Sequence, residues 1–302
     1  MGPSAPILSL ENLAKSYGRV RALRGVSFSV EPGEVFGYLG PNGAGKTTTL
    51  RILLGLVRPS GGRAYLFGKS PSRVDVRVRT GFLPGELALY GNMTGEALLD
   101  YFAGYRPGRR TPLRRALVEA LGIEPAALKT RAKFLSHGTR QKLGLTIAMQ
   151  HDPELLLLDE PTTGFDPLVQ KAFRDLVLDT ARRGRAVVFS SHVLSEVESV
   201  CGRVAILREG ELVAVEAIAS LSAKMVRRLR VRFRNDAPAG LETTPGVTKA
   251  EVEGRTATLW VRGDVNPVLR RVVREELERF VFPEPELEDI FLAYYQGKAD
   301  PR

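Results

Sequence analysis

The segment that most constrains this chain is rich in glycine and runs Gly40-Pro41-Asn42-Gly43-Ala44-Gly45-Lys46-Thr47-Thr48. It follows the apolar run 35–39, which is typical of a buried strand, and precedes residues 49–56, which are typical of a helix. A strand, a glycine-rich turn and a helix N-terminus are the setting of a phosphate-binding loop, because glycines let successive N–H groups face one anion. We expect Lys46 to reach the terminal phosphates and the Thr47 hydroxyl to bind Mg²⁺, which an ordinary glycine-rich turn would not explain.

Two carboxylates end a second buried strand. Residues 155–158 are all leucine, which suits a strand covered on both faces of a parallel sheet, and Asp159 and Glu160 follow them. Ligands of such sheets bind beyond the carboxyl ends of the strands. Asp159 is therefore a candidate Mg²⁺ ligand, directly or through water, and Glu160 is a candidate to polarise an attacking water. Simple solvation of both acids is the alternative, and the phosphate loop in the same sheet argues against it.

Other polar side chains are candidates for the same site. Ser136 stands at the N-cap position of a helical pattern and close to Gly138, so it either caps that helix or helps to bind an anion there. His192 is the one histidine of three that follows a buried strand, and we expect it to contact the γ-phosphate or the attacking water. Tyr17 either stacks on a nucleobase or is a half-buried core tyrosine, and its spacing leaves both open. His151 lies in a turn and is expected at the surface.

The apolar patterns divide the chain into two domains. We expect an α/β phosphate-loop domain over residues 1–220, with a helical subdomain over about 90–150 inserted between its strands. Residues 221–302 predict a small α+β domain, in which we see no catalytic constellation. Its expected strands lie at 229–233, 247–252 and 257–261, and its expected helices at 268–280 and 287–294.

Composition limits the location and the partners. The formal net charge is +10, but the basic clusters are scattered and aromatic residues make up only 7% of the chain. A solvated surface, which an anionic membrane leaflet nearby would attract, explains this charge better than a nucleic-acid surface. No apolar run approaches the roughly 20 residues that span a bilayer, and the N-terminus has no signal-peptide pattern. The single cysteine, Cys201, excludes an intramolecular disulfide, so we expect a cytoplasmic protein.

In their order and spacing these motifs resemble those of an ATP-binding cassette (ABC) ATPase, over about residues 5–220. The resemblance covers the Walker A motif at Gly40–Thr47, Walker B and the catalytic glutamate at Leu155–Glu160, the signature motif at Leu135–Thr139, the D-loop at Gly164–Asp166 and the switch histidine at His192. Tyr17 is similar to the aromatic residue that stacks on adenine. One such motif is weak evidence, whereas five in order are highly specific.

Within this family, the chain is most similar to ATPase subunits of bacterial drug and antibiotic exporters whose permease is a separate polypeptide. The similar segments are Pro161–Pro167, Ser190–Val197 and Leu287–Phe291.

Two motifs depart from the family pattern. The family signature is Leu-Ser-Gly-Gly-Gln, and here His137 and Thr139 replace its third and fifth residues. Ser136 and Gly138 keep the hydroxyl and the close backbone approach, so we expect the motif to function. The Q-loop residue, usually Gln or Glu, is Gly85, and Glu86 would take over its contact with the Mg²⁺ site if the loop shifted by one residue.

The resemblance implies ATP and Mg²⁺ as cofactors and a homodimer with two shared sites. Ser136 of one copy would close on the γ-phosphate that Lys46 of the other copy holds, with Asp166 at the same interface. It also implies an integral membrane permease in two copies, docked by the helical subdomain and the loop 84–90, with this chain peripheral on the cytoplasmic face of the inner membrane. Export of a drug, an antibiotic or a lipid-like cargo is the implied function.

Two other classes of function are weighed against this one. Soluble cassette ATPases that act on ribosomes or nucleic acid carry two cassettes or a long coiled-coil insertion, and neither is visible here, so we expect no nucleic-acid partner. A nucleotide-binding regulatory module without turnover would not need the complete set of Lys46, Asp159, Glu160 and His192.

Overall fold

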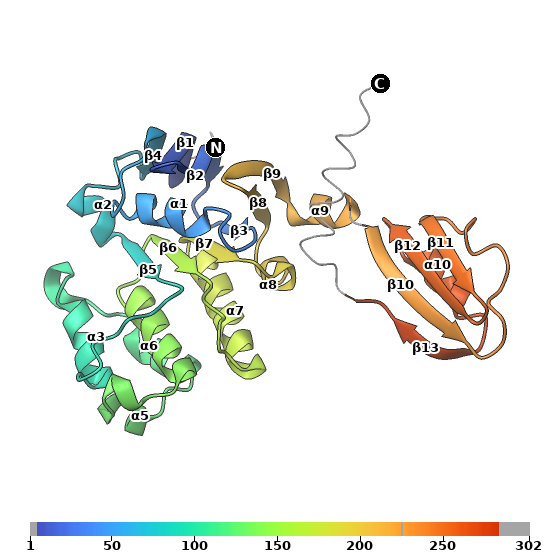
Figure 1. The fold of residues 1–302 in the computed structure, drawn as a ribbon. Coiled ribbons are helices and arrows are strands. Elements are labelled where there is room, and N and C mark those ends of the chain that lie inside the picture. The colour runs from blue at the N-terminus through green and yellow to red at the C-terminus, as the bar shows by residue number, and fades with distance from the viewer. Residues whose placement is uncertain (1–4, 225, 284–302) are drawn as a thin grey trace. The chain divides into compact units, whose positions relative to one another are not determined.

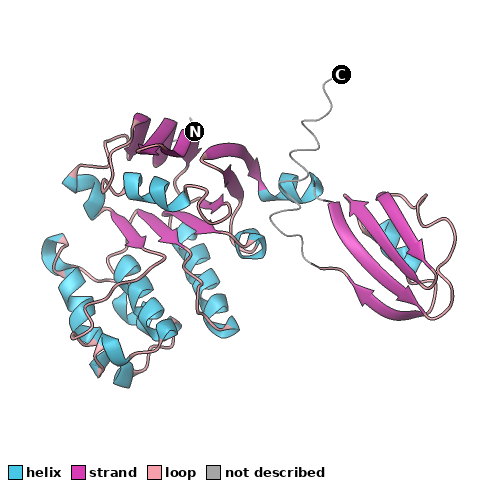
Figure 2. Ribbon diagram, viewed as in Figure 1, coloured by secondary structure: helices cyan, strands magenta, loops and turns pink. Residues whose placement is uncertain are grey.

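The computed structural model describes residues 5–224 and 226–283 (Figures 1 and 2). Its contacts divide the chain into two units. The first runs to Val215 without Val193–Ser195, and the second consists of those three residues and the chain from Glu216 onward.

The first unit is built on a sheet with the strand order β5-β6-β7-β3-β8-β9. Its strands are β3 (Val35–Leu39), β5 (Thr80–Leu83), β6 (Leu155–Asp159), β7 (Ala186–Ser191), β8 (Arg203–Arg208) and β9 (Glu211–Ala217). β5, β6, β7, β3 and β8 pair in parallel, and β3, β6 and β7 are buried at every residue. Parallel pairing brings the carboxyl ends of β3, β6 and β7 to one edge, which is where ligands of such sheets bind.

A smaller antiparallel sheet supports the phosphate loop. Its strand order is β2-β1-β4, with β1 (Leu8–Tyr17), β2 (Val20–Val30) and β4 (Gly61–Leu66). Phe28 on β2 stacks on Phe36 on β3, with ring centroids 5.0 Å apart, so the two sheets share one core. Helix α1 (Lys46–Leu53) contributes Leu50, Ile52 and Leu53 to that core, which fixes the start of the helix under the loop.

Helices surround the central sheet. Those between β4 and β6 are α2 (Val74–Val78), α3 (Gly95–Ala103), α4 (Arg114–Ala120), α5 (Pro125–Lys129) and α6 (His137–Met149), with 3₁₀ turns at Pro107–Arg109 and Ala132–Phe134. They are followed by α7 (Pro167–Arg182) and α8 (Leu194–Glu198). α7 buries Phe173 against Phe189 of β7, with ring centroids 5.9 Å apart. In the described part of the chain, no helix has the length and apolar character needed to cross a bilayer.

The second unit contains an antiparallel sheet with the order β11-β12-β10-β13, preceded by α9 (Ile218–Lys224). Its other elements are β10 (Val226–Phe233), β11 (Val247–Glu253), β12 (Thr256–Arg262), α10 (Asn266–Val272) and β13 (Leu277–Val281). One face of the sheet packs on Val268 and Val272 of α10.

The expectation of a helix over 268–280 is wrong in its second half. α10 ends at Val272, and residues 277–281 form β13, which pairs with β10. The helical spacing of apolar residues continues past Val272, but β10 would otherwise present an unpaired edge, and pairing with β13 satisfies its backbone groups. The predicted helix at 287–294 lies outside the described residues.

The turn at His151 predicted a surface position for this side chain, and the structure differs. It is half-buried, and neither ring nitrogen is exposed or has a hydrogen-bond partner among the described residues. Burial, and then the positive charge of Arg106, lower the pKa of His151 to about 4. The imidazole is therefore neutral at pH 7. The neighbouring Asp152 binds Arg185 at 2.7 Å, which holds the turn against the protein.

Candidate functional site

The phosphate loop joins β3 to α1 through a backbone that only glycine permits. Gly45 precedes the helix with a φ of 110°, and a Cβ there would lie 2.5 Å from the backbone oxygen of Ala22. In the described structure, no side chain caps α1, so N–H groups of its first turn are free to bind an anion.

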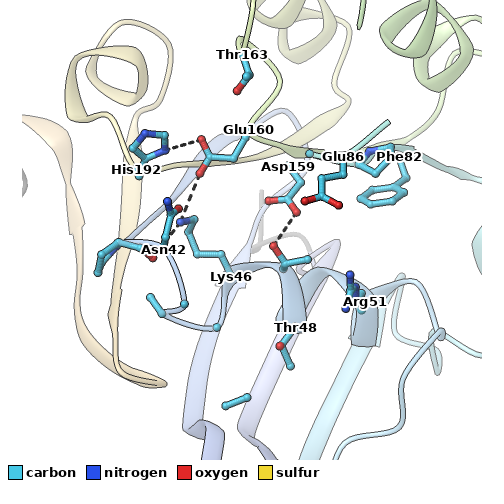
Figure 3. A pocket seen from close by; sticks show the side chains of 18 of the residues that line it. Asn42, Lys46, Thr48, Arg51, Phe82, Glu86, Asp159, Glu160, Thr163 and His192 are labelled. Carbon is cyan, nitrogen blue, oxygen red and sulfur yellow. Dashed lines mark hydrogen bonds and ion pairs between the residues drawn. The ribbon is translucent and has the colours of Figure 1, made fainter. Parts of the chain in front are cut away.

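Lys46 lies inside this loop. Its side chain is only 4% exposed, and Nζ donates to the backbone oxygens of Gly40 at 2.6 Å and Pro41 at 3.3 Å. Nζ is also 3.5 Å from Oε1 of Glu160 (Figure 3). The cation predicted to hold the terminal phosphates therefore faces the carboxylate predicted to orient water.

Asp159 and Thr47 are brought together as expected for a magnesium site. Thr47 Oγ1 donates to Oδ2 of Asp159 at 2.9 Å, and Ser190 Oγ donates to the other carboxylate oxygen at 2.5 Å. Asp159 is buried, and hydroxyl and carboxylate oxygens are the donors that Mg²⁺ prefers. The residues present therefore fit this ion. Ser190 was not a candidate in the sequence, because a serine within an apolar strand carries no distinct signal.

Glu160 and His192 form a pair at the ends of two neighbouring strands. Nδ1 of His192 is 2.8 Å from Oε2 of Glu160, and half of the histidine side chain is exposed. The Glu160 backbone has a φ of 47°, a left-handed conformation that costs free energy in a residue other than glycine. Two hydrogen bonds from Glu160 N to Ser190, one to its backbone oxygen at 3.1 Å, hold this geometry. Such strain is typical of functional positions.

These residues line a single pocket of about 720 Å³. Its lining includes Pro41, Asn42, Gly43, Ala44, Gly45, Lys46, Thr47, Thr48, Glu86, Asp159, Glu160 and His192. Glu86 lies beside Asp159 in Figure 3. A Cβ on Gly85 would lie 3.4 Å from the backbone oxygen of Asp159, so position 85 faces the magnesium site but has no side chain to offer. The role of Glu86 as its substitute stays a prediction.

Five candidates do not line this pocket. Gly40 directly precedes the lining residues, and a Cβ there would clash with the backbone oxygen of Leu207. Tyr17 is 45% exposed at the end of β1, with Lys15 Nζ 4.9 Å from its ring centroid, and stacking on adenine stays a prediction. Ser136 caps α6 by accepting from Thr139 N at 3.1 Å. Asp166 caps α7 by accepting from the N–H groups of residues 168 and 169. Gly138 lies in the first turn of α6, where a Cβ would be 3.1 Å from the backbone oxygen of Gly164.

His137, which differs from the glycine of the family signature, packs against the turn before α7. The imidazole lies against Gly164, where a Cβ would be 2.5 Å from Cδ2 of His137. Gly164 also has a φ of 80°, so glycine is required there twice over. The start of α6 and the turn before α7 therefore contact each other within one chain.

Glu196 was not a candidate site residue from the sequence, although it supports both members of the Glu160–His192 pair. One carboxylate oxygen accepts from Thr162 Oγ1 at 2.6 Å and the other from Ser191 Oγ at 2.6 Å. Thr162 follows Glu160 by two residues, and Ser191 precedes His192 directly. A single carboxylate thus joins the two chain segments that carry the pair. The one sequence observation that included Glu196 was the similarity of the segment 190–197 to exporter ATPases.

Glu196→Gln is expected to lower kcat for ATP about tenfold while the KM changes little. The amide nitrogen cannot accept from a hydroxyl, so one hydroxyl must turn to accept from it, and both bridges lose the carboxylate charge, at a cost of about 1–2 kcal/mol. Steady-state ATPase kinetics measure both constants, and Glu119→Gln on the exposed face of α4 is the matched control. An unchanged kcat, or a loss confined to KM, would show that Glu196 does not position the pair.

Comparison with known proteins identifies relatives of the whole chain. The family model described as ABC transporter matches residues 23–163. The Nod factor export ATP-binding protein I of Paraburkholderia xenovorans is 36% identical over 96% of this chain and 97% of its own length. A fluoroquinolones export ATP-binding protein of Mycobacterium tuberculosis is 38% identical over 74% of each chain.

Two longer relatives and one solved structure complete the comparison. The chain spans 58% and 59% of the length of two uncharacterized ABC transporter ATP-binding proteins, from Synechocystis and Nostoc. The solved structure of an ATP-binding subunit of an ABC transporter superposes with a TM-score of 0.66 and 27% identity, over 71% of this chain and 91% of that one.

Proposed function

This chain belongs to the ABC transporter family of ATP-binding proteins, and we propose that it hydrolyses ATP to power export through a separate membrane permease. The observation that carries the proposal is the convergence of Lys46, Asp159, Glu160 and His192 on the phosphate loop. These are the groups that phosphoryl transfer to water requires: a cation for the phosphates, an oxygen ligand for the metal, and a carboxylate to orient the water.

Each residue of the pocket has a defined part in this reaction. Lys46 exchanges its 3.5 Å ion pair with Glu160 for the phosphate oxygens of ATP, since that ion pair is long and easily replaced. Glu160 is then free to accept a hydrogen bond from the attacking water, with His192 fixing the orientation of its carboxylate. Thr47 and Asp159 would hold Mg²⁺, which when bound neutralises charge on the phosphate oxygens.

Two copies of the chain are proposed to share each nucleotide. Ser136 and Gly138 carry the signature motif but do not line the pocket of their own chain. The exposed start of α6 is available to a partner, and its capped N-terminus presents N–H groups toward an anion. We infer a head-to-tail homodimer in which the signature helix of one copy completes the pocket of the other.

An exposed aromatic cluster on the helical subdomain supports docking to the permease. Tyr90, Tyr101 and Tyr105 are 55%, 39% and 64% exposed, and Tyr101 lies at 5.3 Å from each of the other two rings. Exposed aromatic residues are enriched at protein interfaces, and Tyr90 ends the loop predicted to contact the permease. We propose a peripheral location on the cytoplasmic face of the inner membrane, and a drug, an antibiotic or a lipid-like molecule as cargo.

Co-purification tests the proposed partner. The tagged full-length chain, extracted from membranes in mild detergent, should bring down an integral membrane protein, and Tyr90→Ser with Tyr105→Ser should reduce its recovery severalfold. Val74→Ser with Val273→Ser, two exposed apolar residues outside the aromatic cluster and outside the nucleotide pocket, is the matched control. Recovery of ribosomes or nucleic acid in place of a membrane protein would support the soluble alternative.

A further inference from the structure

The sheet of the second unit carries a row of arginines on the face opposite α10. Along β10 the apolar residues alternate with arginines, and the apolar ones are fully buried in the core with α10. The arginines between them, Arg228, Arg230 and Arg232, are exposed on the other face. β13 places Arg279 directly across from Arg232. Like charges at directly opposed positions destabilise an antiparallel pair, so an anion bound at this face would relieve their repulsion.

Part of this face is hollowed. The hollow of about 240 Å³ is lined by Arg230, Arg232, Thr256, Arg279 and Val281, from three neighbouring strands. It is smaller than the roughly 300–1,000 Å³ of pockets that enclose drug-sized ligands. A compact anionic group would fill it, and the rest of a larger ligand would stay in solvent.

Two of the three arginines of the hollow lack the acidic partners that other cations of this unit have. Three pairs elsewhere in the unit lie within 3.4 Å: Arg234–Glu276, Arg271–Glu275 and Lys249–Glu251. In the hollow, Arg232 is 3.1 Å from Glu278. The backbones of Arg230 and Arg279 pair in the sheet, but their side chains make no hydrogen bond or ion pair with any residue that the structure describes. Within the described part of the chain, two guanidinium groups without a protein partner therefore border one small space.

We propose that this hollow binds a small molecule through a diphosphate group. The planar guanidinium donates two parallel hydrogen bonds to neighbouring phosphate oxygens, and the positive charges of Arg230 and Arg279 offset two of the negative charges of a diphosphate. The Thr256 hydroxyl adds a neutral donor on the β12 side. No other role that we assign to the chain depends on this site.

The aromatic residue of this face argues against a nucleic-acid strand as the ligand. Trp260 of β12 has Arg228 at 5.6 Å and Lys249 at 4.7 Å from its ring centroid. Those cations come from the strands on either side of β12 and occupy the positions that a stacked base would need.

Trp260 also makes the proposal measurable, because it is the only tryptophan in the chain. Its fluorescence is followed while the intact protein is titrated with pyrophosphate at constant ionic strength and without Mg²⁺. A saturable change is expected in the unaltered chain. Arg230→Gln with Arg279→Gln should weaken the apparent affinity about tenfold or more, since each lost charge-assisted bond is worth about that factor.

Two controls separate this site from the phosphate loop and from net charge. Arg234→Gln with Arg271→Gln removes the same charge outside the hollow, and should leave the titration unchanged. Lys46→Ala damages the phosphate loop of the first unit, and the Trp260 response should persist in it. If the unaltered chain showed the Trp260 response but no ATP hydrolysis, the proposed catalysis alone would fail.

Other results would overturn the proposal. An equal response in the Arg230/Arg279 variant would place the ligand elsewhere. A response to a single-stranded oligonucleotide or to phosphatidylglycerol vesicles, without any response to pyrophosphate, would also overturn the proposal. It would identify a nucleic acid or a membrane as the partner. If sodium chloride at equal ionic strength produced the same fluorescence change as pyrophosphate, the change would be due to screening of charges by salt and not to binding.

Discussion

Glu160→Gln is expected to stop ATP turnover while the chain still binds ATP. Glutamine keeps the size of the side chain and can still hydrogen-bond His192, but it removes the negative charge that orients and deprotonates water. We expect kcat to fall by about 10²–10⁴-fold, the usual contribution of a general base. Because the charge that competes for Lys46 is also lost, ATP affinity should be retained or increase. Phosphate release and equilibrium binding of ATP measure the two quantities.

The same variant should accumulate as an ATP-bound dimer, because the hydrolysis that would separate the two copies no longer occurs. Size-exclusion chromatography with light scattering, with and without ATP and Mg²⁺, detects the change of mass. Glu119→Gln serves again as the control with full turnover. If Glu160→Gln released phosphate at the rate of the unaltered chain, the glutamate would have no place in the mechanism.

Two inactive variants are expected to restore each other's activity when mixed. Lys46→Ala removes the cation of the phosphate loop, and Ser136→Arg blocks the signature helix with a bulky side chain. Each alone should lose nearly all turnover, since every site in its homodimer lacks one component. In a mixed dimer, the intact Lys46 of one chain meets the intact Ser136 of the other, so one complete site forms. With equal mixing, about a quarter of the original turnover should return.

The mixing ratio provides the control for this experiment. Recovered activity should be greatest at equal amounts and vanish at either end of the series. Mixing Lys46→Ala with Glu160→Gln should restore nothing, because both residues belong to the same pocket. Activity that failed to return at any ratio, while the mixed dimer formed, would contradict the shared site.

The catalytic pocket was predictable because its residues follow from local pattern and from topology. Gly45 and Lys46 stand at a strand-to-helix turn, and Asp159 and His192 stand at the ends of strands that must be parallel. Pairing of parallel strands then brings these ends together without any knowledge of side-chain contacts.

The supporting contacts could not be predicted in this way. Ser190 and Glu196 act through single hydroxyl–carboxylate bonds between segments about 30 residues or more apart, and no periodicity records them. The strand at 277–281 has a helical spacing of apolar residues, and only the unpaired edge of β10 decides its conformation. The pKa of His151 is lowered by burial and by the positive charge of Arg106, a residue far away in the sequence whose side chain no local pattern could place.

The imidazole packed on Gly164 links the conformations of these two positions. A Cβ at position 164 would lie 2.5 Å from Cδ2 of His137 in its observed place, so Gly164→Ala would force the ring to turn away. The φ of 80° at Gly164 favours glycine independently of that ring, so His137→Gly would relieve the contact but not the backbone strain. The turn before α7 therefore tolerates side-chain changes at position 137 more readily than at position 164.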